Sequence, residues 1–367
     1  MSLTMNDSAD GRTPSVSLLV PIYNVERYLR QCLESARAQT LEDIEVICIN
    51  DGSTDGSRGI VEEYLEDGRF RVIDKPNSGY GASMNRGLDE ARGRYVGILE
   101  SDDFLDPAAL EEMLRLARSH DADVVKADFY LHWSVPAPRD EAFGFVSPSM
   151  AGRVMEPLDD LRIFYRKPSI WSALYRVDFL KANGIRFLET PGASYQDSGF
   201  NFKVWACAHR VILTEKAYLH YRQDNEASSV NSPGKAYCVC DEYDEMDRFL
   251  RGRPDLPAKL RPVMLKMKYD SYMWNYERLS PELQGGFLAR TAQEFKGHLD
   301  RGELDLDLFE PWKVEDLRRI VDDPAAYHRR RARLAKLGRA GKALHYLGMG
   351  GPGMLAEIAR TRKRESL

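Results

Sequence analysis

Residues 44–57, IEVICINDGSTDGS, decide the fold because they join a strand to a helix through a polar loop. Residues 44–49 form an apolar run whose length suits a strand that is buried on both faces. Asp55 is expected to cap a helix that continues to Leu65. A buried strand, a short loop and a helix in this order form the repeating unit of α/β proteins with a parallel sheet.

The same alternation extends in both directions from this unit. Strands are predicted at residues 15–20, 70–73, 95–99 and 124–129, and helices at residues 25–36, 79–91 and from Pro107 onward. The sequence therefore predicts an α/β fold in which helices flank a mostly parallel sheet. Ligands bind such sheets at the carboxyl ends of the strands, where two acidic loops follow the second and fourth strands.

The rest of the chain is expected to fall into further parts. Residues 1–14 are polar and predicted to be disordered, residues 15–232 form the α/β domain, residues 233–325 a helical region, and residues 326–367 a basic helical tail. Within the α/β domain, residues 158–165 and 177–182 are predicted to be helical and residues 211–221 to form a strand. The helical region is predicted to hold helices near residues 235–250, 256–279 and 281–299.

Composition and charge restrict the partners. The chain has 367 residues and a formal net charge of -5 at pH 7, so nothing in the overall charge suggests nucleic acid as a partner. Its 5 cysteines, an odd number in mostly apolar surroundings, are typical of reduced thiols in a cytoplasmic protein. We expect no signal peptide and no membrane-spanning segment, since no apolar run approaches roughly 18 residues.

The basic tail differs from the acidic body of the chain. From Arg329 to Arg364 it is rich in lysine and arginine, has one acidic residue, Glu357, and carries leucines between residues 334 and 347. A basic helix with apolar residues binds anionic lipid surfaces, which predicts peripheral contact with the inner face of the plasma membrane. A solvated helix packed on its own domain is the alternative.

The acidic loop Glu100-Ser101-Asp102-Asp103 is a candidate metal site. It follows the predicted strand 95–99 directly, so its carboxylates are fixed by the sheet and open to solvent. Carboxylate ligands in small number suit Mg²⁺ or Mn²⁺ that is shared with the phosphates of a nucleotide. The alternative is a solvated turn that caps the helix after Pro107.

The loop after the second strand is a candidate base-binding loop. Asp51 can accept a hydrogen bond from a pyrimidine N–H, and Gly52 lets the backbone approach a ring. The alternatives are a helix-capping turn and a calcium loop, although the calcium pattern lacks its glutamate. Residues 79–82 fail the dinucleotide fingerprint because the third glycine is absent. Asn77 and Arg86 around them are candidates for contact with a diphosphate, and the alternative is an ordinary loop and helix face.

Three segments together resemble the inverting family 2 glycosyltransferases, which have the GT-A nucleotide-sugar fold. They are VPIYNVERYLRQCLES (residues 20–35), VICINDGSTDGS (46–57) and NSGYGASMNRGLDEARGRYVGILESDDF (77–104). The resemblance is close over residues 15–106 and looser to about residue 229. It implies that the nucleobase is held by a set of residues from the first two strand ends, namely Pro21, Tyr23, Asn24 and Asp51.

The resemblance also assigns the acidic loop. It implies that Glu100 and Ser101 contact the ribose and that Asp102, with Asp103 as a second candidate, holds the metal. Glu100 departs from the family pattern, which has aspartate at that position; glutamate keeps the charge and reaches further.

A second acidic segment, residues 192–200, resembles the family's catalytic-base motif. Asp197 falls on the position of the general base that takes the proton of the acceptor hydroxyl. Gln196 stands where the family has glutamate, which removes a neighbouring like charge. The alternative for Asp197 is an N-cap of a helix over residues 198–208.

Three more residues are candidates on weaker grounds. Trp171 is either an aromatic wall for the acceptor sugar or a core residue. His220 ends the last predicted strand and is either a further metal ligand or an ordinary strand-end histidine. Arg222 follows it and is expected to contact the diphosphate.

The resulting hypothesis is a glycosyltransferase that moves a sugar from a nucleoside-diphosphate donor, with uridine favoured by the resemblance, to an acceptor hydroxyl. The acceptor is expected to be a saccharide or a lipid-linked saccharide in the assembly of surface polysaccharide or glycolipid. Two alternatives are a catalytically degenerate sugar-nucleotide or glycan-binding module and a sugar-nucleotide nucleotidyltransferase. The second is disfavoured because residues 21–24 lack the glycine-rich loop that such enzymes need after the first strand.

Overall fold

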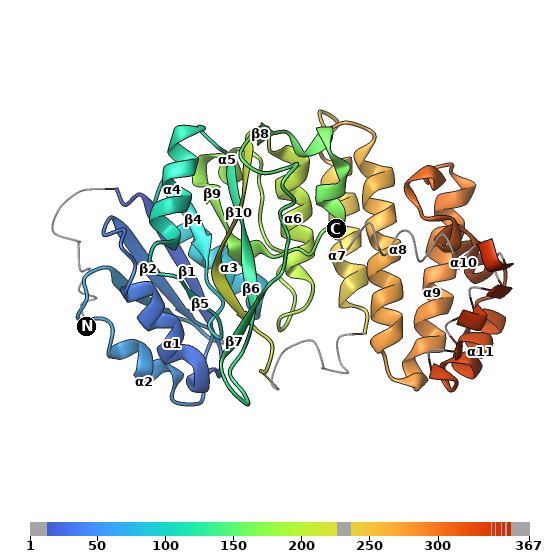
Figure 1. The fold of residues 1–367 in the computed structure, drawn as a ribbon, viewed down its shortest axis with the longest axis horizontal. Helices are drawn as coiled ribbons and strands as arrows, with labels where there is room; N and C mark the ends of the chain where they lie inside the picture. The colour runs from blue at the N-terminus through green and yellow to red at the C-terminus, as the bar shows by residue number, and fades with distance from the viewer. Residues whose placement is uncertain are drawn as a thin grey trace. The chain divides into compact units, whose positions relative to one another are not determined.

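The computed structural model describes residues 13–225 and 236–353, except residues 339, 342, 346, 349 and 350. The chain divides into two compact units, Met1–Asn231 and Ser232–Leu367, each with its own internal contacts (Figure 1). The division falls next to the predicted boundary after residue 232. Most of the predicted disordered segment 1–14 and residues 354–367 of the predicted tail lie outside the described residues.

The first unit is built on one mixed sheet. Its central strands are fully buried because they are covered on both faces, as the apolar runs predict. The strands are β1 (Val16–Ile22), β2 (Ile44–Asn50), β3 (Phe70–Asp74), β4 (Tyr95–Ile98), β5 (Phe104–Leu105), β6 (Val124–Trp133), β7 (Arg139–Ala142), β8 (Val154–Met155), β9 (Ala173–Arg176) and β10 (Val211–Arg222). The order along the sheet is β3-β2-β1-β4-β9-β6-β10-β5, while β7 pairs with β6 and β8 with β10.

The longest strand pairings of the sheet are parallel, and the shortest ones are antiparallel. The pairs β1–β2, β1–β4, β2–β3 and β6–β10 are parallel, whereas β9 is antiparallel to both β4 and β6. The sequence analysis did not predict β9, because its four residues follow a 3-10 turn over Ile170–Ser172 and show no alternation of their own. The predicted strand positions for β1, β2, β3, β4, β6 and β10 are confirmed within a few residues.

Helices connect these strands and flank the sheet in Figure 1. They are α1 (Glu26–Arg37), α2 (Ser57–Glu62), α3 (Tyr80–Glu90), α4 (Ala109–Ser119), α5 (Val177–Ala182) and α6 (Gln196–Cys207). Helix α2 ends at Glu62, before the predicted Leu65, and its N-cap position is Gly56 and not the predicted Asp55. Asp55 lies one residue earlier, where its Oδ1 accepts a hydrogen bond from the backbone N–H of Ser57 at 3.0 Å. The predicted helix at residues 158–165 is instead two 3-10 turns, Pro157–Asp159 and Leu161–Tyr165.

One face of α3 is held against the segment that leads toward Asp197. Asn85 donates from Nδ2 to the carbonyl oxygen of Phe187 and accepts from its N–H, both at 2.9 Å. The N–H of Tyr80 donates to the carbonyl oxygen of Gly192 at 2.9 Å. Gly81 allows this approach, since a Cβ there would overlap the carbonyl of Leu188. The glycines of this segment therefore serve backbone packing.

The second unit is helical, as predicted. Its helices are α7 (Cys238–Arg251), α8 (Leu260–Arg278), α9 (Pro281–Asp300), α10 (Pro311–Asp322) and α11 (Pro324–Ala335), with a 3-10 turn at Leu306–Leu308. Helix α11 runs across the boundary proposed at residue 325, so the basic segment starts within a helix whose Tyr327 is buried. No described helix is long and apolar enough to cross a membrane.

The close packing of α3 generates a stability prediction. We expect Gly81→Ala to lower the free energy of unfolding of the first unit by roughly 1–3 kcal/mol, because the added methyl group must displace the backbone at Leu188. Helix propensity alone would have the opposite effect. The measurement is urea unfolding followed by the circular dichroism signal.

Gly59→Ala in α2 is the matched control, since a Cβ at Gly59 meets nothing within 4 Å. That change should be neutral or stabilising by up to about 1 kcal/mol. Equal effects of the two substitutions would contradict the packing argument.

Candidate active site

Asp51 lies at the carboxyl end of β2 and is 5% exposed. Its Oδ1 accepts from the N–H of Ser78 at 2.9 Å and from the ammonium of Lys75, and its Oδ2 accepts from the N–H of Gly79 at 3.0 Å. Asp51 therefore fixes the loop before α3. Oδ2 accepts one hydrogen bond, which leaves it able to accept another from a base.

The end of β1 supplies the open side of the same region. Pro21 is buried and pairs with Ile49 of β2, whereas the ring of Tyr23 is 52% exposed. Asn24, with φ 49°, accepts from the N–H of Thr54 at 2.8 Å and so ties this loop to the loop after β2. Tyr23 is thus free to stack on a flat ligand beside Asp51.

Glu100 lies at the carboxyl end of β4, next to β1 in the sheet. The hydroxyl of Tyr80 donates to its Oε1 at 2.6 Å. Burial, together with the nearby charges of Asp102 and Asp197, raises the pKa of Glu100 to about 8 even though the Tyr80 hydroxyl opposes the rise. The structure thus brings the predicted ribose contact close to the predicted catalytic base.

Asp102 and Asp103 differ in their surroundings. Asp102 is half-buried, and its Oδ2 accepts from Nδ2 of Asn225 at 2.8 Å. Asp103 is 1% exposed; its Oδ1 accepts from the N–H of Arg222 at 2.8 Å, while its buried Oδ2 has no hydrogen-bond partner. Burial and the charge of Asp102 hold the pKa of Asp103 well above its usual range. A buried carboxylate oxygen without a donor suits a nearby cation.

Arg222 is used inside the protein. Its side chain is 2% exposed, Nε donates to the carbonyl of Asp102 at 2.7 Å, and Nη2 donates to Gln31 at 2.6 Å. The remaining guanidinium nitrogen, Nη1, donates to the hydroxyl of Ser134. This arrangement does not support the predicted contact with a diphosphate, because no donor faces solvent; Arg222 instead positions the acidic loop.

Asp197 lies in the first turn of α6, which starts at Gln196 after Tyr195 with φ 62°. It is therefore not the N-cap, which was the alternative to the catalytic role. Its Oδ1 accepts from the N–H of Ser198 at 2.8 Å, and its Oδ2 accepts no hydrogen bond from the described residues. Burial raises the pKa of Asp197 to about 6, opposed by that N–H and by the charge of Lys167.

Aromatic rings line the same region. Trp171 is 8% exposed and stacks on Tyr221, with ring centroids 4.7 Å apart. The ammonium of Lys167 lies 4.2 Å from the centroid of the Tyr221 ring. Burial, followed by the charges of Asp103 and Asp102, raises the pKa of Tyr221. The burial of Trp171 does not support an aromatic wall for the acceptor, whereas Tyr221 is half-buried and feels the charges of these carboxyl groups.

Two predicted diphosphate contacts lie at the surface. Asn77 is exposed and follows Lys75 in the loop that Asp51 holds. Arg86 is exposed on α3 and forms an ion pair with Glu90 at 2.7 Å. Neither residue is drawn into the cluster of carboxylates, so their contact with a donor stays a prediction.

His220 requires a correction. Side chains alternate along a strand, so His220 points to the face of β10 opposite Tyr221. Among the described residues, the group able to hold a metal is His132, Asp140 and His220; Asp102 and Asp103 do not join it. The predicted metal set of Asp102, Asp103 and His220 is therefore wrong as a single site, and the acidic loop keeps Asp102 and Asp103.

The sequence analysis missed Tyr80, Lys167 and Tyr221. Tyr80 lay within a quoted segment, but nothing in that segment indicated that its hydroxyl would face a carboxylate. Tyr221 could have been found from strand alternation next to His220. Lys167 is thirty residues from Asp197 along the chain. Only the fold brings its charge close enough to lower the pKa of that carboxyl.

Together these side chains can do two kinds of chemistry. Asp102 and Asp103 offer hard oxygen ligands for Mg²⁺ or Mn²⁺, and few protein ligands suffice when phosphates supply the rest. Asp197, with a pKa of about 6, is deprotonated at neutral pH and basic enough to accept a proton from a hydroxyl in a transition state.

Residues 17–162 match the family model described as glycosyl transferase family 2. The chain is 36% identical over 220 residues to EpsH and 32% identical over 217 residues to EpsJ, both glycosyltransferases by name from Bacillus subtilis. These matches cover 57% and 58% of this chain and 61% and 62% of the two relatives, so the chain spans about three fifths of their length. Hyaluronan synthase of Pasteurella multocida is 40% identical over 114 residues, 31% of this chain and 12% of that protein.

The fold is shared with a solved structure. Residues 1–349 of TarS from Staphylococcus aureus superpose with a TM-score of 0.66 at 21% identity, covering 89% of this chain and 92% of that one. TarS has also been solved in complex with UDP-GlcNAc, and that structure gives a TM-score of 0.65 with 86% of this chain and 90% of TarS covered. The predicted GT-A-like α/β fold with a C-terminal helical region is confirmed.

The raised pKa of Glu100 generates a prediction about stability in metal-free protein. Because the folded state holds this proton up to about pH 8 and an unfolded glutamate releases it near 4.5, the folded state binds more protons in that window. The free energy of unfolding should therefore fall as pH rises through it, by at most about 1.4 kcal/mol per pH unit. Glu100→Gln should flatten this dependence, as measured by urea unfolding in EDTA from pH 5 to pH 8.

Glu66→Gln removes an exposed glutamate and serves as the control that keeps the wild-type slope. An unchanged slope in Glu100→Gln would show that the proton resides on a different group.

Proposed function

We propose that this chain, whose residues 17–162 match the model of glycosyl transferase family 2, transfers a sugar from a nucleoside-diphosphate donor to an acceptor hydroxyl with inversion. One observation carries the proposal. Asp197, with a free Oδ2 and a pKa raised to about 6, acts electrostatically on Glu100 at the acidic end of β4. A base therefore stands beside the place where a family 2 donor would be held.

The donor side of the proposal rests on the ends of β1 and β2. The exposed ring of Tyr23 stacks on the nucleobase, and Oδ2 of Asp51 accepts from its N–H. Uridine is the proposed base, because the sequence resembles enzymes that use it and TarS, which shares the fold, binds UDP-GlcNAc. Glu100 is the proposed ribose contact, and its protonated carboxyl at neutral pH can donate a hydrogen bond as well as accept one.

The metal side rests on Asp102 and Asp103. The buried, unpartnered Oδ2 of Asp103 and the half-buried carboxylate of Asp102 fit a hard divalent cation, Mn²⁺ or Mg²⁺. When bound, the cation neutralises the charge that develops on the departing diphosphate. The protein's own part is to hold both carboxylates in place, which Arg222 does through the Asp102 carbonyl and the Asp103 carboxylate.

The chemical step uses Asp197 as general base. Its Oδ2 takes the proton of the acceptor hydroxyl as that oxygen attacks the anomeric carbon from the face opposite the diphosphate. The N–H of Ser198 holds the other oxygen, so the carboxylate presents one oxygen only. Lys167 stabilises the ionised carboxylate and keeps the pKa from rising further.

The proposed acceptor is a saccharide or a lipid-linked saccharide in surface polysaccharide assembly, at the cytoplasmic face of the membrane. Hyaluronan synthase among the relatives supports a polysaccharide product. The exposed Arg329, Arg333 and Lys336 and the half-exposed Leu337 support peripheral contact with anionic lipid.

Nucleotide binding is the first test of this proposal. We expect UDP with Mn²⁺ to raise the melting temperature of the protein more than GDP, CDP or dTDP, because binding to the folded state stabilises it. Asp102→Asn should remove the Mn²⁺-dependent part of the shift.

Asp178→Asn, at an exposed position on α5, is the control that should keep it. Failure of every nucleoside diphosphate to shift the melting temperature, with or without Mn²⁺, would favour a degenerate glycan-binding module over the enzyme.

The base assignment gives a separate prediction. Asp197→Asn should lower kcat/KM for transfer by about 10²–10⁴-fold while leaving the Kd for UDP with Mn²⁺ unchanged, since the amide cannot accept the proton. The measurement is donor consumption with a panel of saccharide acceptors, alongside calorimetric titration of UDP. Full activity in Asp197→Asn would refute this assignment and leave the donor site untouched.

A further inference from the structure

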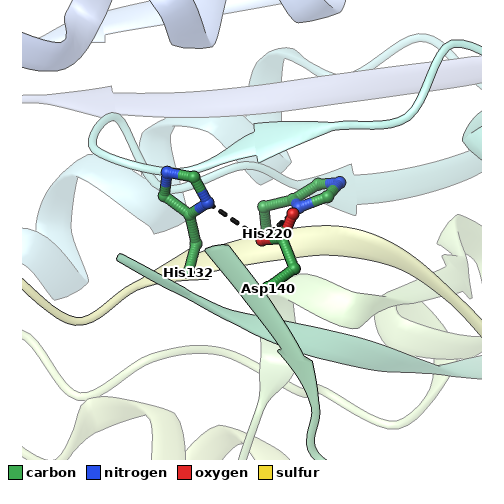
Figure 2. A group of neighbouring side chains, drawn as sticks. All are labelled: His132, Asp140 and His220. Carbon is green, nitrogen blue, oxygen red and sulfur yellow. Dashed lines mark hydrogen bonds and ion pairs between the residues drawn. The ribbon is translucent and has the colours of Figure 1, made fainter. Parts of the chain in front are cut away.

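Three neighbouring strands bring two histidines and an aspartate to one face of the sheet. His132 of β6 stands directly opposite Asp140 of β7 in the antiparallel register. On the other side of β6, His220 of β10 stands opposite Tyr130, two residues before His132. Residues two apart share a face of a strand, so the three side chains meet (Figure 2). The face is opposite to that of Tyr221.

The two imidazoles converge on one oxygen. The Nδ1 atoms of His132 and His220 each lie 2.9 Å from Oδ1 of Asp140, and one ligand atom from each residue lies within 4.8 Å of the others. The histidines are 5% and 9% exposed, whereas Asp140 is exposed on the edge hairpin. The cluster is therefore built on buried side chains and reachable from solvent.

The outer nitrogens of both rings also have partners. Nε2 of His220 lies 3.2 Å from Oδ1 of Asp106, and Nε2 of His132 lies 3.3 Å from the hydroxyl of Ser134. A neutral imidazole has one N–H, yet His220 faces a carboxylate oxygen from each nitrogen. Either His220 is an imidazolium, or its Nε2–H donates to Asp106 and its Nδ1 lone pair binds a cation.

Both rings fit the second of these arrangements, in which Nε2–H donates to a protein oxygen and the Nδ1 lone pair faces a cation. Metal-bound histidines donate their other N–H to a carboxylate, carbonyl or hydroxyl, which fixes the tautomer. Asp106 and Ser134 supply such acceptors, so both Nδ1 lone pairs point toward Asp140. Nitrogen and oxygen ligands of one ion at about 2.0–2.2 Å are separated by roughly 3 Å, close to the spacing found here.

We propose that His132, Asp140 and His220 bind a divalent transition-metal ion of the zinc class, with water completing the coordination. Imidazole ligands favour Zn²⁺, Co²⁺ and Ni²⁺ over Mg²⁺ and Mn²⁺, so this site is chemically distinct from the carboxylates Asp102 and Asp103. The cysteines are not competitors in the described part of the chain, since none of them belongs to a group able to hold a metal.

A bound ion would also restrict the movement of the acidic loop, because His220 contacts the segment that follows it. His220 stacks on Phe104 with ring centroids 4.3 Å apart, and its Nε2 faces Asp106. Both residues belong to the segment that follows Asp102 and Asp103. An ion that fixes His220 therefore fixes the strand β5 and, through it, the carboxyl groups of the acidic loop, without contacting the donor.

The test is metal uptake by the full chain after treatment with a chelator. Equilibrium dialysis against Zn²⁺ in excess Mg²⁺, read by elemental analysis, should give one tightly bound ion per chain. Co²⁺ should give a visible absorption spectrum of low-coordinate nitrogen and oxygen ligation. His132→Gln and Asp140→Asn should each weaken Zn²⁺ binding at least tenfold.

Two controls separate this site from others. His209→Gln changes an exposed histidine and Asp102→Asn changes the acidic loop, and both should keep wild-type Zn²⁺ affinity. Asp140 is at the surface, so Asp140→Asn is expected to fold, and circular dichroism verifies this. Absence of uptake by folded protein, or uptake unaffected by Asp140→Asn and His132→Gln, would overturn the proposal. Binding of UDP with Mn²⁺ is measured separately on the same protein, so failure of the zinc site and failure of the proposed function are distinguishable.

Discussion

Carboxyl groups held out of water where β2 and β4 end are the constraint on which the rest of the first unit depends. Asp51 and Asp103 are each at most 5% exposed, and charged groups at such depth need donors or cations close by. The donors come from far along the chain: Lys75 and the N–H groups before α3 for Asp51, and the end of β10 for Asp103. Satisfying these oxygens thus determines the course of the loops around them.

The same constraint separates the pKa values of two other carboxyl groups at this edge. Asp197 has an N–H donor and a nearby lysine, and both oppose the rise in its pKa. Glu100 has one hydroxyl donor and two neighbouring carboxyl groups, and its pKa rises to about 8, whereas that of Asp197 rises to about 6. At neutral pH Glu100 therefore holds a proton, whereas Asp197 is able to accept one.

The sequence predicted the strands that carry this site, but it could not predict the tertiary contacts between their ends. Buried runs followed by polar loops located β1, β2 and β4, and so placed Asp51 and Asp102 at one edge of the sheet. Strand β9 and the contacts of Arg222 escaped prediction, because antiparallel insertion and the filling of a guanidinium's donors are properties of tertiary packing. The sequence grouped His220 with Asp102 and Asp103 because it does not show which side chains of β6 lie beside His220, and that depends on the register between β10 and β6.

The docking of α3 against residues 187–192 has a consequence for the way such a chain can change. The match to the family model ends at residue 162, before the segment 187–192 on which α3 packs. Gly81 and Asn85 of α3 contact the backbone of Leu188 and Phe187 in that later segment. A chimaera that takes residues 187–192 from a relative must therefore take the matching α3 as well, and the crossover point that preserves this contact lies before residue 79.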